Sequence, residues 1–236
     1  MGKISRTAQK RHHDAMKLWE SKDKFDHEDT LYFYGHYQEG ATQLNALAGA
    51  FFTPWELARD FSMHVQGNSI IDLCAGTGML SYACTGNNRE DKLVCVELNQ
   101  EYATLGRKLV PWATWYHKDV TELNELAEED KFDVAISNPP FGKIGGYDMF
   151  DLEVVRIASR VARTGVFILP QMSTPFRCSG RSGFEQETTP KLAKWMEKNN
   201  IKFEMNCGID CNIYIDQWKG VKPIVEIVLC DFTQGN

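Results

Sequence analysis

The sequence predicts an α/β fold with a mostly parallel sheet and helices on both faces, and three observations lead to this prediction. Short apolar runs of strand length alternate along the chain with segments that have the periodicity of helices. Two of the apolar runs end in a glycine-rich or polar stretch, as strands do at the carboxyl edge of open α/β sheets, where ligands bind. Hydrophobic residues make up 43% of the 236 positions, which is enough for one sizeable core.

Seven strands are expected, and the last two close the sheet as a hairpin-like pair. Helices between the other strands cover the two faces. The expected strands begin at Ser69, Leu93, Thr114, Val134, Val166, Phe203 and Ile224, and the expected helices include residues 100–109, 121–129, 150–163 and 191–198.

Charge and composition limit the class of protein. The net charge of −6 argues against coating nucleic acid through overall charge, although the first 24 residues form a local basic patch. No run of 18 apolar residues occurs and the N-terminus lacks the apolar core of a signal peptide, so a cytoplasmic location is expected. The seven cysteines are scattered, and Cys207 and Cys211 have no second pair or histidine cluster behind them, so no metal site is expected.

The N-terminal region combines basic and aromatic residues. Ala15, Met16, Leu18 and Trp19 suggest a short amphipathic helix, which is either a solvated basic helix or an arm that contacts nucleic acid. Residues 31–50, with four aromatic rings followed by glycines and small residues, read as a loop leading to a closely packed helix.

The stretch after the fourth strand is the centre of the functional prediction. Asn138 is followed by two prolines and Phe141, which the strand places at the carboxyl edge of the sheet. Proline has no backbone donor, so carbonyl groups nearby stay free to accept hydrogen bonds. An amide oxygen, a free carbonyl and a flat ring suit a planar group that carries an NH2. A plain turn is the alternative, because Asn-Pro marks turns.

A second stretch joins an apolar strand to a helix through a turn that contains Gly76 and Gly78. Glycines let backbone amides approach a ligand closely, and Asp72 lies at the end of the strand. Glu97 ends the next strand about 20 residues later, where an acid accepts hydrogen bonds from ribose hydroxyls. Asp119, after the third strand, either accepts from an adenine amine or caps the helix that follows.

Upstream of the glycine turn, Thr53 is expected to cap a helix whose first residue is Pro54, with Glu56 three positions after the cap. The helix start is also a possible anion site, because unpaired N–H groups point out of it.

Two loops are expected beside the site, residues 142–149 and residues 171–189. Loops as long as the second tend to be functional or mobile. Its aromatic and arginine side chains suit a flipped base or a backbone phosphate, and a disordered surface loop is the alternative. These side chains belong to Phe176, Arg177, Arg181 and Phe184.

Together these stretches resemble the class I S-adenosylmethionine-dependent methyltransferases, and more narrowly the adenine-N6 methyltransferases of the Asn-Pro-Pro-Phe type. The Phe-Phe-Thr-Pro stretch that ends at Pro54 is similar to a motif of N6-adenine DNA methyltransferases, and compact phage and mobile-element enzymes fit it best. The C-terminal half is also similar to rRNA adenine-N6 methyltransferases, which use a small activating partner. The resemblance implies a Rossmann-like catalytic domain over residues 50–236, preceded by an extension over residues 1–49.

The resemblance also implies a role for each matching residue. The methionine part of S-adenosyl-L-methionine would lie against the glycine turn and the upstream motif, the ribose hydroxyls on Glu97 and the cofactor adenine on Asp119. The target amine would donate to Asn138 and to the carbonyl of Pro139, and the target base would stack on Phe141. The implied cofactor-binding residues are Phe52, Thr53, Asp72, Ala75, Gly76, Gly78, Glu97 and Asp119, and the implied catalytic residues are Asn138, Pro139, Pro140 and Phe141.

The expected reaction is methylation of adenine N6 in DNA, without a metal. Loose sequence specificity is expected, because the chain has no room for a separate target-recognition domain. Nucleic acid would contact the two loops and the basic N-terminus. RNA adenine-N6 methylation is the main alternative, followed by methylation of guanine N2 or of a protein glutamine amide; the glutamine enzymes typically carry tyrosine where this chain has Phe141.

Two other classes of function remain as alternatives. The first is a non-catalytic module with this fold that holds nucleic acid or a partner protein. The second is a nicotinamide-dependent oxidoreductase, against which the sequence argues, because the third glycine of the dinucleotide fingerprint would fall at Ser81.

Overall fold

A computed structural model describes residues 5–38, 51–86, 92–205 and 208–233 of the chain. Its centre is a seven-stranded sheet with the strand order β3-β2-β1-β4-β5-β9-β8. Strands β1 to β5 are parallel to one another, and β9 is antiparallel to both β5 and β8. This arrangement confirms the predicted mostly parallel sheet of a Rossmann-like class I methyltransferase fold.

Six of the seven strands of this sheet begin within two residues of their predicted starts. Strand β5 begins four residues before the expected Val166, so the helix expected over residues 150–163 ends at Val161, and β8 is only two residues long. Because β1, β2, β3 and β4 are parallel, their carboxyl ends meet at one edge of the sheet. The strands are β1 (Ser69–Leu73), β2 (Lys92–Glu97), β3 (Thr114–His117), β4 (Phe132–Ser137), β5 (Ala162–Pro170), β8 (Glu204–Met205) and β9 (Val225–Asp231).

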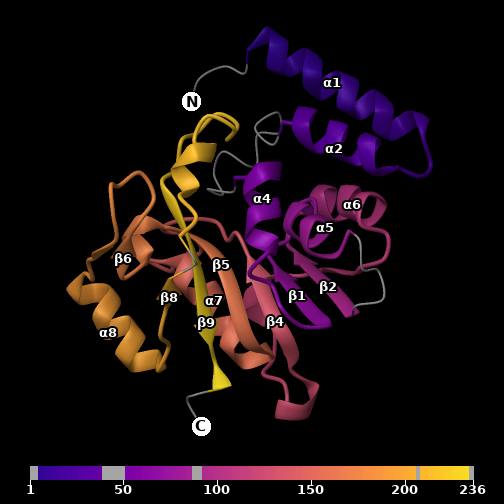
Figure 1. The fold of residues 1–236 in the computed structure, drawn as a ribbon. Coiled ribbons are helices and arrows are strands. Elements are labelled where there is room, and N and C mark those ends of the chain that lie inside the picture. The colour runs from indigo at the N-terminus through magenta and orange to yellow at the C-terminus, as the bar shows by residue number, and fades with distance from the viewer. Residues whose placement is uncertain (1–4, 39–50, 87–91, 206–207, 234–236) are drawn as a thin grey trace.

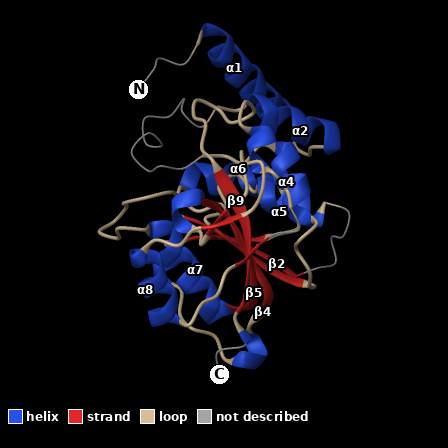
Figure 2. Cartoon of the chain, turned by 60° about the vertical axis from the view of Figure 1, so that its left-hand side comes forward, coloured by secondary structure: helices blue, strands red, loops and turns tan. Residues whose placement is uncertain are grey.

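Helices cover both faces of the sheet (Figure 2). Each face has its own cluster of buried apolar side chains. One face packs against α4 (Trp55–Ser62), α5 (Met79–Thr85) and α6 (Gln100–Leu109). The other packs against α7 (Phe150–Val161) and α8 (Pro190–Asn199). The predicted bounds of α6 are confirmed. Asn99 starts this helix because its side-chain oxygen accepts from the amides of Glu101 and Tyr102, at 2.9 and 3.3 Å.

Two further helices, α1 (Arg6–Ser21) and α2 (His27–His36), lie beside α4, α5 and α6 (Figure 1). Helix α1 confirms the predicted amphipathic helix. The prediction of a loop from residue 31 was wrong as far as residue 36, because a capping box between Asp26 and Asp29 starts α2 just before the aromatic run. Residues 39–50, which include the proposed boundary between extension and catalytic domain, lie outside the described residues.

Two other expected elements differ from the sequence interpretation. The helix expected over residues 121–129 is a pair of single 3-10 turns, η2 (Val120–Glu122) and η3 (Glu128–Asp130), separated by residues outside any helix. The segment 171–189 contains the 3-10 turn η4 (Gln171–Ser173) and a small hairpin of β6 (Phe176–Arg177) and β7 (Glu185–Gln186). That segment is therefore a loop with a defined conformation that contains a small hairpin.

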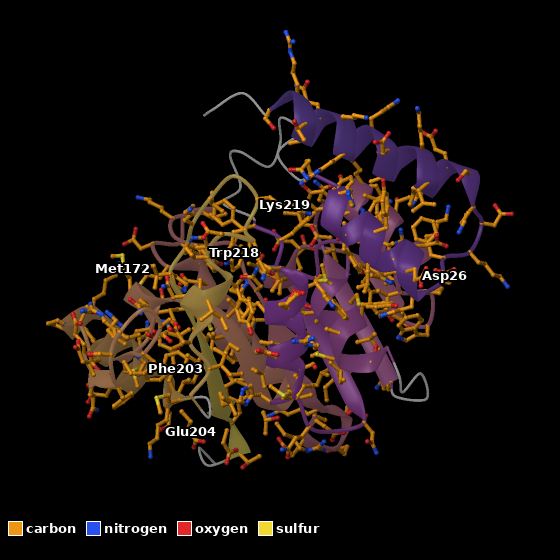
Figure 3. The ribbon with its side chains drawn as sticks, turned by 45° about the horizontal axis from the view of Figure 1, so that its top comes forward. Asp26, Met172, Phe203, Glu204, Trp218 and Lys219 are labelled. Atoms are coloured by element: carbon orange, nitrogen blue, oxygen red, sulfur yellow. The ribbon has the colours of Figure 1, made fainter. Side chains whose placement is uncertain are left out.

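A long excursion between β8 and β9 returns to the end of the molecule where α2 lies. It includes the 3-10 turn η5 (Cys211–Tyr214). The ammonium of Lys219, shown in Figure 3, donates to the backbone carbonyls of Tyr34 and Tyr37 at 2.5 and 2.7 Å, so it binds the last turn of α2. The hydroxyl of Tyr214 donates to Asp60 of α4. The segment between β8 and β9 is thus hydrogen-bonded to α2 and α4 near the N-terminus.

Within the described residues, no helix is long and apolar enough to cross a membrane. The six cysteines in this part of the chain are free, and Cys207 lies outside it.

Candidate functional site

A cavity of about 1210 Å³ lies at the carboxyl ends of β1, β2, β3 and β4. Pockets for one drug-sized ligand usually measure ~300–1,000 Å³, so this cavity has room for a nucleotide-sized cofactor together with a second planar group. Of the sequence-predicted site residues, nine line it: Phe52, Thr53, Asp72, Ala75, Gly76, Glu97, Asp119, Asn138 and Pro140. Gly78, Pro139 and Phe141 do not line it.

The turn after β1 is held in an unusual backbone conformation. Cys74 has a φ of 64°, which is rare for a residue with a side chain, and Gly76 has a φ of 58°. Strained residues of this kind cluster at ligand sites. Added at Gly76, a Cβ would lie 3.2 Å from a ring carbon of Phe52, so the glycine lets the turn and the upstream motif approach each other.

Gly78 does not line the cavity, and its lack of a side chain is needed for the packing of α5. Its φ is 89°, and a Cβ there would lie 2.8 Å from Val110 and 3.1 Å from Trp115. The second glycine of the turn therefore lets α5 start close to the end of α6 and to β3.

Glu97 fixes the shape of the site through both of its carboxylate oxygens. One accepts from the backbone amide of Gly76 and the other from that of Asn99, each at 2.7 Å. Burial raises the pKa of Glu97, and these backbone hydrogen bonds act in the opposite direction. Each oxygen has a second lone pair, so the carboxylate can also accept from the hydroxyls of a ribose in the cavity.

Asp119 faces the cavity and also starts η2, so both roles considered for it from the sequence are compatible. Its Oδ1 accepts from the backbone amide and the hydroxyl of Thr121, each at 2.8 Å. The capped element is a single 3-10 turn rather than the expected helix.

Asp72 carries an acceptor that no described residue uses. The residue is buried, its Oδ2 accepts from the hydroxyl of Ser81 at 2.6 Å, and its Oδ1 has no hydrogen-bond partner among the described residues. Burial raises the pKa of Asp72 to about 7. A cationic ammonium in the cavity, such as that of S-adenosyl-L-methionine, would supply the missing donor and favour the ionised form.

We expect the effect of Asp72→Asn on the free energy of unfolding of the ligand-free protein to be more favourable at pH 8 than at pH 5. The pKa of Asp72 in the folded protein is above its unfolded value of 3.8. The contribution of Asp72 to wild-type stability is therefore fully present below about pH 4 and is lost as pH rises to about 7. At one pKa unit per ~1.4 kcal/mol, this loss is on the order of a few kcal/mol. Urea unfolding of both proteins at the two pH values checks it. An equal effect of the substitution at both pH values would contradict the raised pKa.

Asn138 has its amide group fixed by two acceptors from the upstream motif. Its Nδ2 donates to the backbone carbonyl of Phe51 at 2.8 Å and to the hydroxyl oxygen of Thr53 at 3.0 Å. A backbone carbonyl can only accept, so the amide nitrogen must face Phe51 and the oxygen must point elsewhere. That oxygen, Oδ1, is buried and has no hydrogen-bond partner among the described residues. Asn138 thus presents an oriented acceptor that no described residue uses, and the residue lines the cavity.

The expectation that Thr53 caps a helix was wrong. Helix α4 begins at Trp55, the residue before it is Pro54, and no side chain makes a capping hydrogen bond there. The Thr53 hydroxyl is used by Asn138 instead, 85 residues later in the chain. The same segment brings Phe51 next to Phe141, with ring centroids 6.0 Å apart.

Other cavity residues were not predicted from the sequence. Met16 and Trp19 of α1 line the cavity, and the amphipathic pattern that predicted this helix gave no sign of what its apolar face would cover. The hydroxyl of Tyr34, on α2, donates to the backbone carbonyl of Thr77 at 3.1 Å and so supports the glycine turn.

The two loops that were expected to contact nucleic acid, residues 142–149 and 171–189, differ in their position relative to the cavity. Ile144, Gly145 and Tyr147 of the loop over residues 142–149 line the cavity. In the segment 171–189, Phe176 and Arg177 are buried, with exposed fractions of 4% and 7%, so the expectation that they contact nucleic acid was wrong. The Arg177 guanidinium donates to backbone carbonyls of its own segment and is structural.

The Arg181 and Phe184 side chains of the same segment remain exposed.

Comparison with known proteins identifies the class of enzyme. Residues 56–165, which contain the glycine turn, Glu97, Asp119 and Asn138, match the model of the methyltransferase small domain family. The chain is an S-adenosylmethionine-dependent methyltransferase. Its cofactor is S-adenosyl-L-methionine, which when bound supplies an electrophilic methyl group.

Individual relatives are distant. An rRNA N6-adenosine methyltransferase of Drosophila melanogaster, Mettl5, is 27% identical over 186 residues, covering 74% of this chain and 82% of that protein. A solved structure of a candidate RNA methyltransferase from Pyrococcus horikoshii is 19% identical, with 92% of this chain and 96% of that chain covered and a TM-score of 0.46. A Pyrococcus abyssi tRNA (uracil-54, C5)-methyltransferase with S-adenosyl-L-homocysteine is 15% identical, covering 75% and 37% of the two chains, with a TM-score of 0.44.

Proposed function

We propose that this methyltransferase modifies the N6 amine of adenine in a nucleic acid. The observation that carries the proposal is the buried, unpartnered Oδ1 of Asn138 on the wall of the cavity. A buried acceptor without a donor costs ~1–3 kcal/mol, so a substrate that brings an N–H group to this oxygen recovers that cost. An exocyclic amine has two N–H groups, of which one can bond to Asn138 and the second to a backbone carbonyl of the two-proline turn.

The side chains around Asn138 suit a flat ring that bears the amine. Pro140 lines the cavity together with Asn138 and offers it a ring face, whereas the Phe141 ring, expected to stack on the base, packs against Phe51 and does not line the cavity. Acceptors that hold the N–H groups draw the amine lone pair out of conjugation with the ring, which makes the nitrogen a better nucleophile. Fixing this nitrogen in line with a methyl donor can supply roughly 7–11 kcal/mol of the barrier reduction. The proton that the nitrogen loses needs no strong base, because the alkylated amine is a strong acid.

RNA is the nucleic acid that we propose as substrate, in place of the DNA expected from the sequence. The Drosophila relative is named as acting on rRNA at this same nitrogen, and it spans most of this chain. DNA remains the second candidate, because the Phe-Phe-Thr-Pro segment, which resembles a motif of DNA enzymes, is the segment that orients Asn138. In duplex DNA the base must first leave the stack, which costs a few kcal/mol.

Transfer of radiolabelled methyl groups to matched substrates tests the proposal. The protein is given rRNA, an RNA oligonucleotide, a DNA oligonucleotide of the same sequence in single- and double-stranded form, and a glutamine-containing peptide. Label in RNA supports the proposal, and label in DNA alone shifts it to the second candidate. Label in the peptide alone, or in none of these, would contradict it.

Thr53 has a positioning role in this proposal, and its variants give a further prediction. Thr53→Val removes the hydroxyl that accepts from Asn138 Nδ2, so one N–H loses its acceptor and the amide is held by the Phe51 carbonyl alone. We expect kcat to fall about tenfold, which corresponds to ~1.4 kcal/mol. Thr53→Ser keeps the hydroxyl and should keep most of the rate.

Rates at saturating cofactor, together with the cofactor dissociation constant, check the role of Thr53. If both variants lose cofactor affinity and keep kcat, Thr53 acts on the cofactor and does not position Asn138.

A further inference from the structure

Helix α1 has two faces of different chemistry, and its inner face is part of the cavity. Ala15 on this face is buried, and Met16 and Trp19 line the cavity together with the cofactor-site residues. The helix is fixed there: the Lys108 ammonium donates to the backbone carbonyl of Trp19 and lies 4.5 Å from the centroid of its ring. The His12 ring packs on Tyr37, with centroids 5.0 Å apart.

The opposite face of α1 carries a row of basic side chains. Arg6, Lys10, His13 and Lys17 recur at the three- and four-residue spacing that places side chains on one side of a helix. All four are exposed, and none is in an ion pair with another residue in the described part of the chain. At 1.5 Å per residue the row is ~16 Å long, which matches several successive phosphates of one strand.

The charge of this region contrasts with that of the rest of the chain. The first 24 residues contain seven Lys or Arg against three Asp or Glu, a net of +4, whereas the whole protein carries −6. A polyanion is repelled by the net negative charge of the rest of the protein and attracted to the positive N-terminal region. The location of the positive charge therefore directs where a nucleic acid strand lies.

We propose that the outer row of α1, defined as Arg6, Lys10, His13 and Lys17, binds the phosphodiester backbone of the substrate strand beside the cavity. The helix then has a double role: its outer face holds phosphates, and its inner face closes the space into which a nucleotide of the same strand enters. The proposal deepens the proposed function and rests on it for the identity of the substrate. It assigns the sequence-predicted basic arm to four named residues on a fixed helix.

Binding measurements on two matched triple variants test this proposal separately from catalysis. The first variant is Arg6→Gln, Lys10→Gln and Lys17→Gln. The control is Lys194→Gln, Lys198→Gln and Lys202→Gln, which removes three exposed charges on and after α8, far from α1 in Figure 1. Glutamine keeps helix propensity close to that of lysine and arginine. The probes are a fluorescent 20-nucleotide RNA and a DNA of the same sequence, titrated over a range of salt concentrations.

We expect the α1 variant to bind the probe at least tenfold more weakly than wild type at low salt, while the control stays within about twofold. Three lost phosphate contacts should also reduce the slope of log affinity against log salt by about 2, at ~0.7 per contact for a single strand. The affinity for S-adenosyl-L-methionine should not change. An α1 variant that binds both probes as tightly as the control would overturn the inference.

Comparison of the affinities for the RNA and DNA probes shows which nucleic acid the outer row of α1 prefers. Methyl transfer by the wild-type protein is measured in parallel. If α1-dependent binding occurs without any methyl transfer, the proposed function fails and the α1 inference stands; if transfer occurs and the α1 variant matches the control, only the α1 inference fails.

Discussion

Asn138→Ala is expected to reduce the methyl-transfer rate by ~10²–10³-fold, the range seen when one hydrogen-bonding group that acts on the transition state is removed. The substitution deletes the unpartnered Oδ1 and, with it, the group that orients the target amine. It also leaves the Phe51 carbonyl and the Thr53 hydroxyl without the Nδ2 donor, which changes local packing but not the glycine turn or Glu97. Affinity for S-adenosyl-L-methionine should therefore stay within a few-fold of wild type.

Single-turnover rates and calorimetric titration of the cofactor separate these two effects. Asn124→Ala is a suitable control, because Asn124 is an exposed asparagine between η2 and η3. A variant at position 138 that loses cofactor affinity and rate in equal measure would show that Asn138 supports the fold of the site and does not hold the substrate.

Gly106→Ala should destabilise the protein strongly, by ~1–3 kcal/mol or more, whereas Gly35→Ala should stabilise it by up to ~1 kcal/mol. Both glycines lie within helices, so alanine favours the helix equally at each. A Cβ at Gly106 would lie 2.1 Å from the ring of Trp115, whose indole N–H donates to the carbonyl of Val110 at 3.2 Å and cannot move freely. A Cβ at Gly35 would meet no atom of the described residues within 4 Å.

Chemical unfolding of the two glycine variants measures the difference. Helix α6 carries part of the cofactor cavity and lies against β3, so the Gly106 variant should also bind S-adenosyl-L-methionine more weakly. Equal stabilities of the two variants would mean that Trp115 can repack around a methyl group.

The fold was predictable because its strands and helices are marked locally in the sequence. The strand predicted to begin at Thr114 and the helix predicted over residues 100–109 agree with β3 and α6, since residue periodicity acts over a few residues. Helix α2 was missed although its start is also marked locally, by the capping box between Asp26 and Asp29, because the expectation of a loop from residue 31 rested on aromatic and small residues alone. Contacts between residues that are distant in the chain leave no such local mark.

The candidate site shows the same limit. Residue types and spacing brought Asp72, Glu97, Asp119 and Asn138 to one edge of the sheet, where the cavity now places them. The sequence could not show that Thr53 bonds to Asn138 instead of capping α4, because the two residues are 85 positions apart. It also could not show that Arg177 would be buried, since a guanidinium enclosed by backbone carbonyls leaves no local signature.

The most direct test of the account is the position of the methyl group on the product nucleoside. RNA methylated by the wild-type protein is digested to nucleosides and analysed by chromatography and mass spectrometry against N6-methyladenosine, N1-methyladenosine and N2-methylguanosine standards. We expect N6-methyladenosine, because Asn138 Oδ1, which has no partner among the described residues, can accept from an exocyclic amine. A methyl group on a ring nitrogen would contradict the role of Asn138, since a ring nitrogen brings no N–H group to this oxygen.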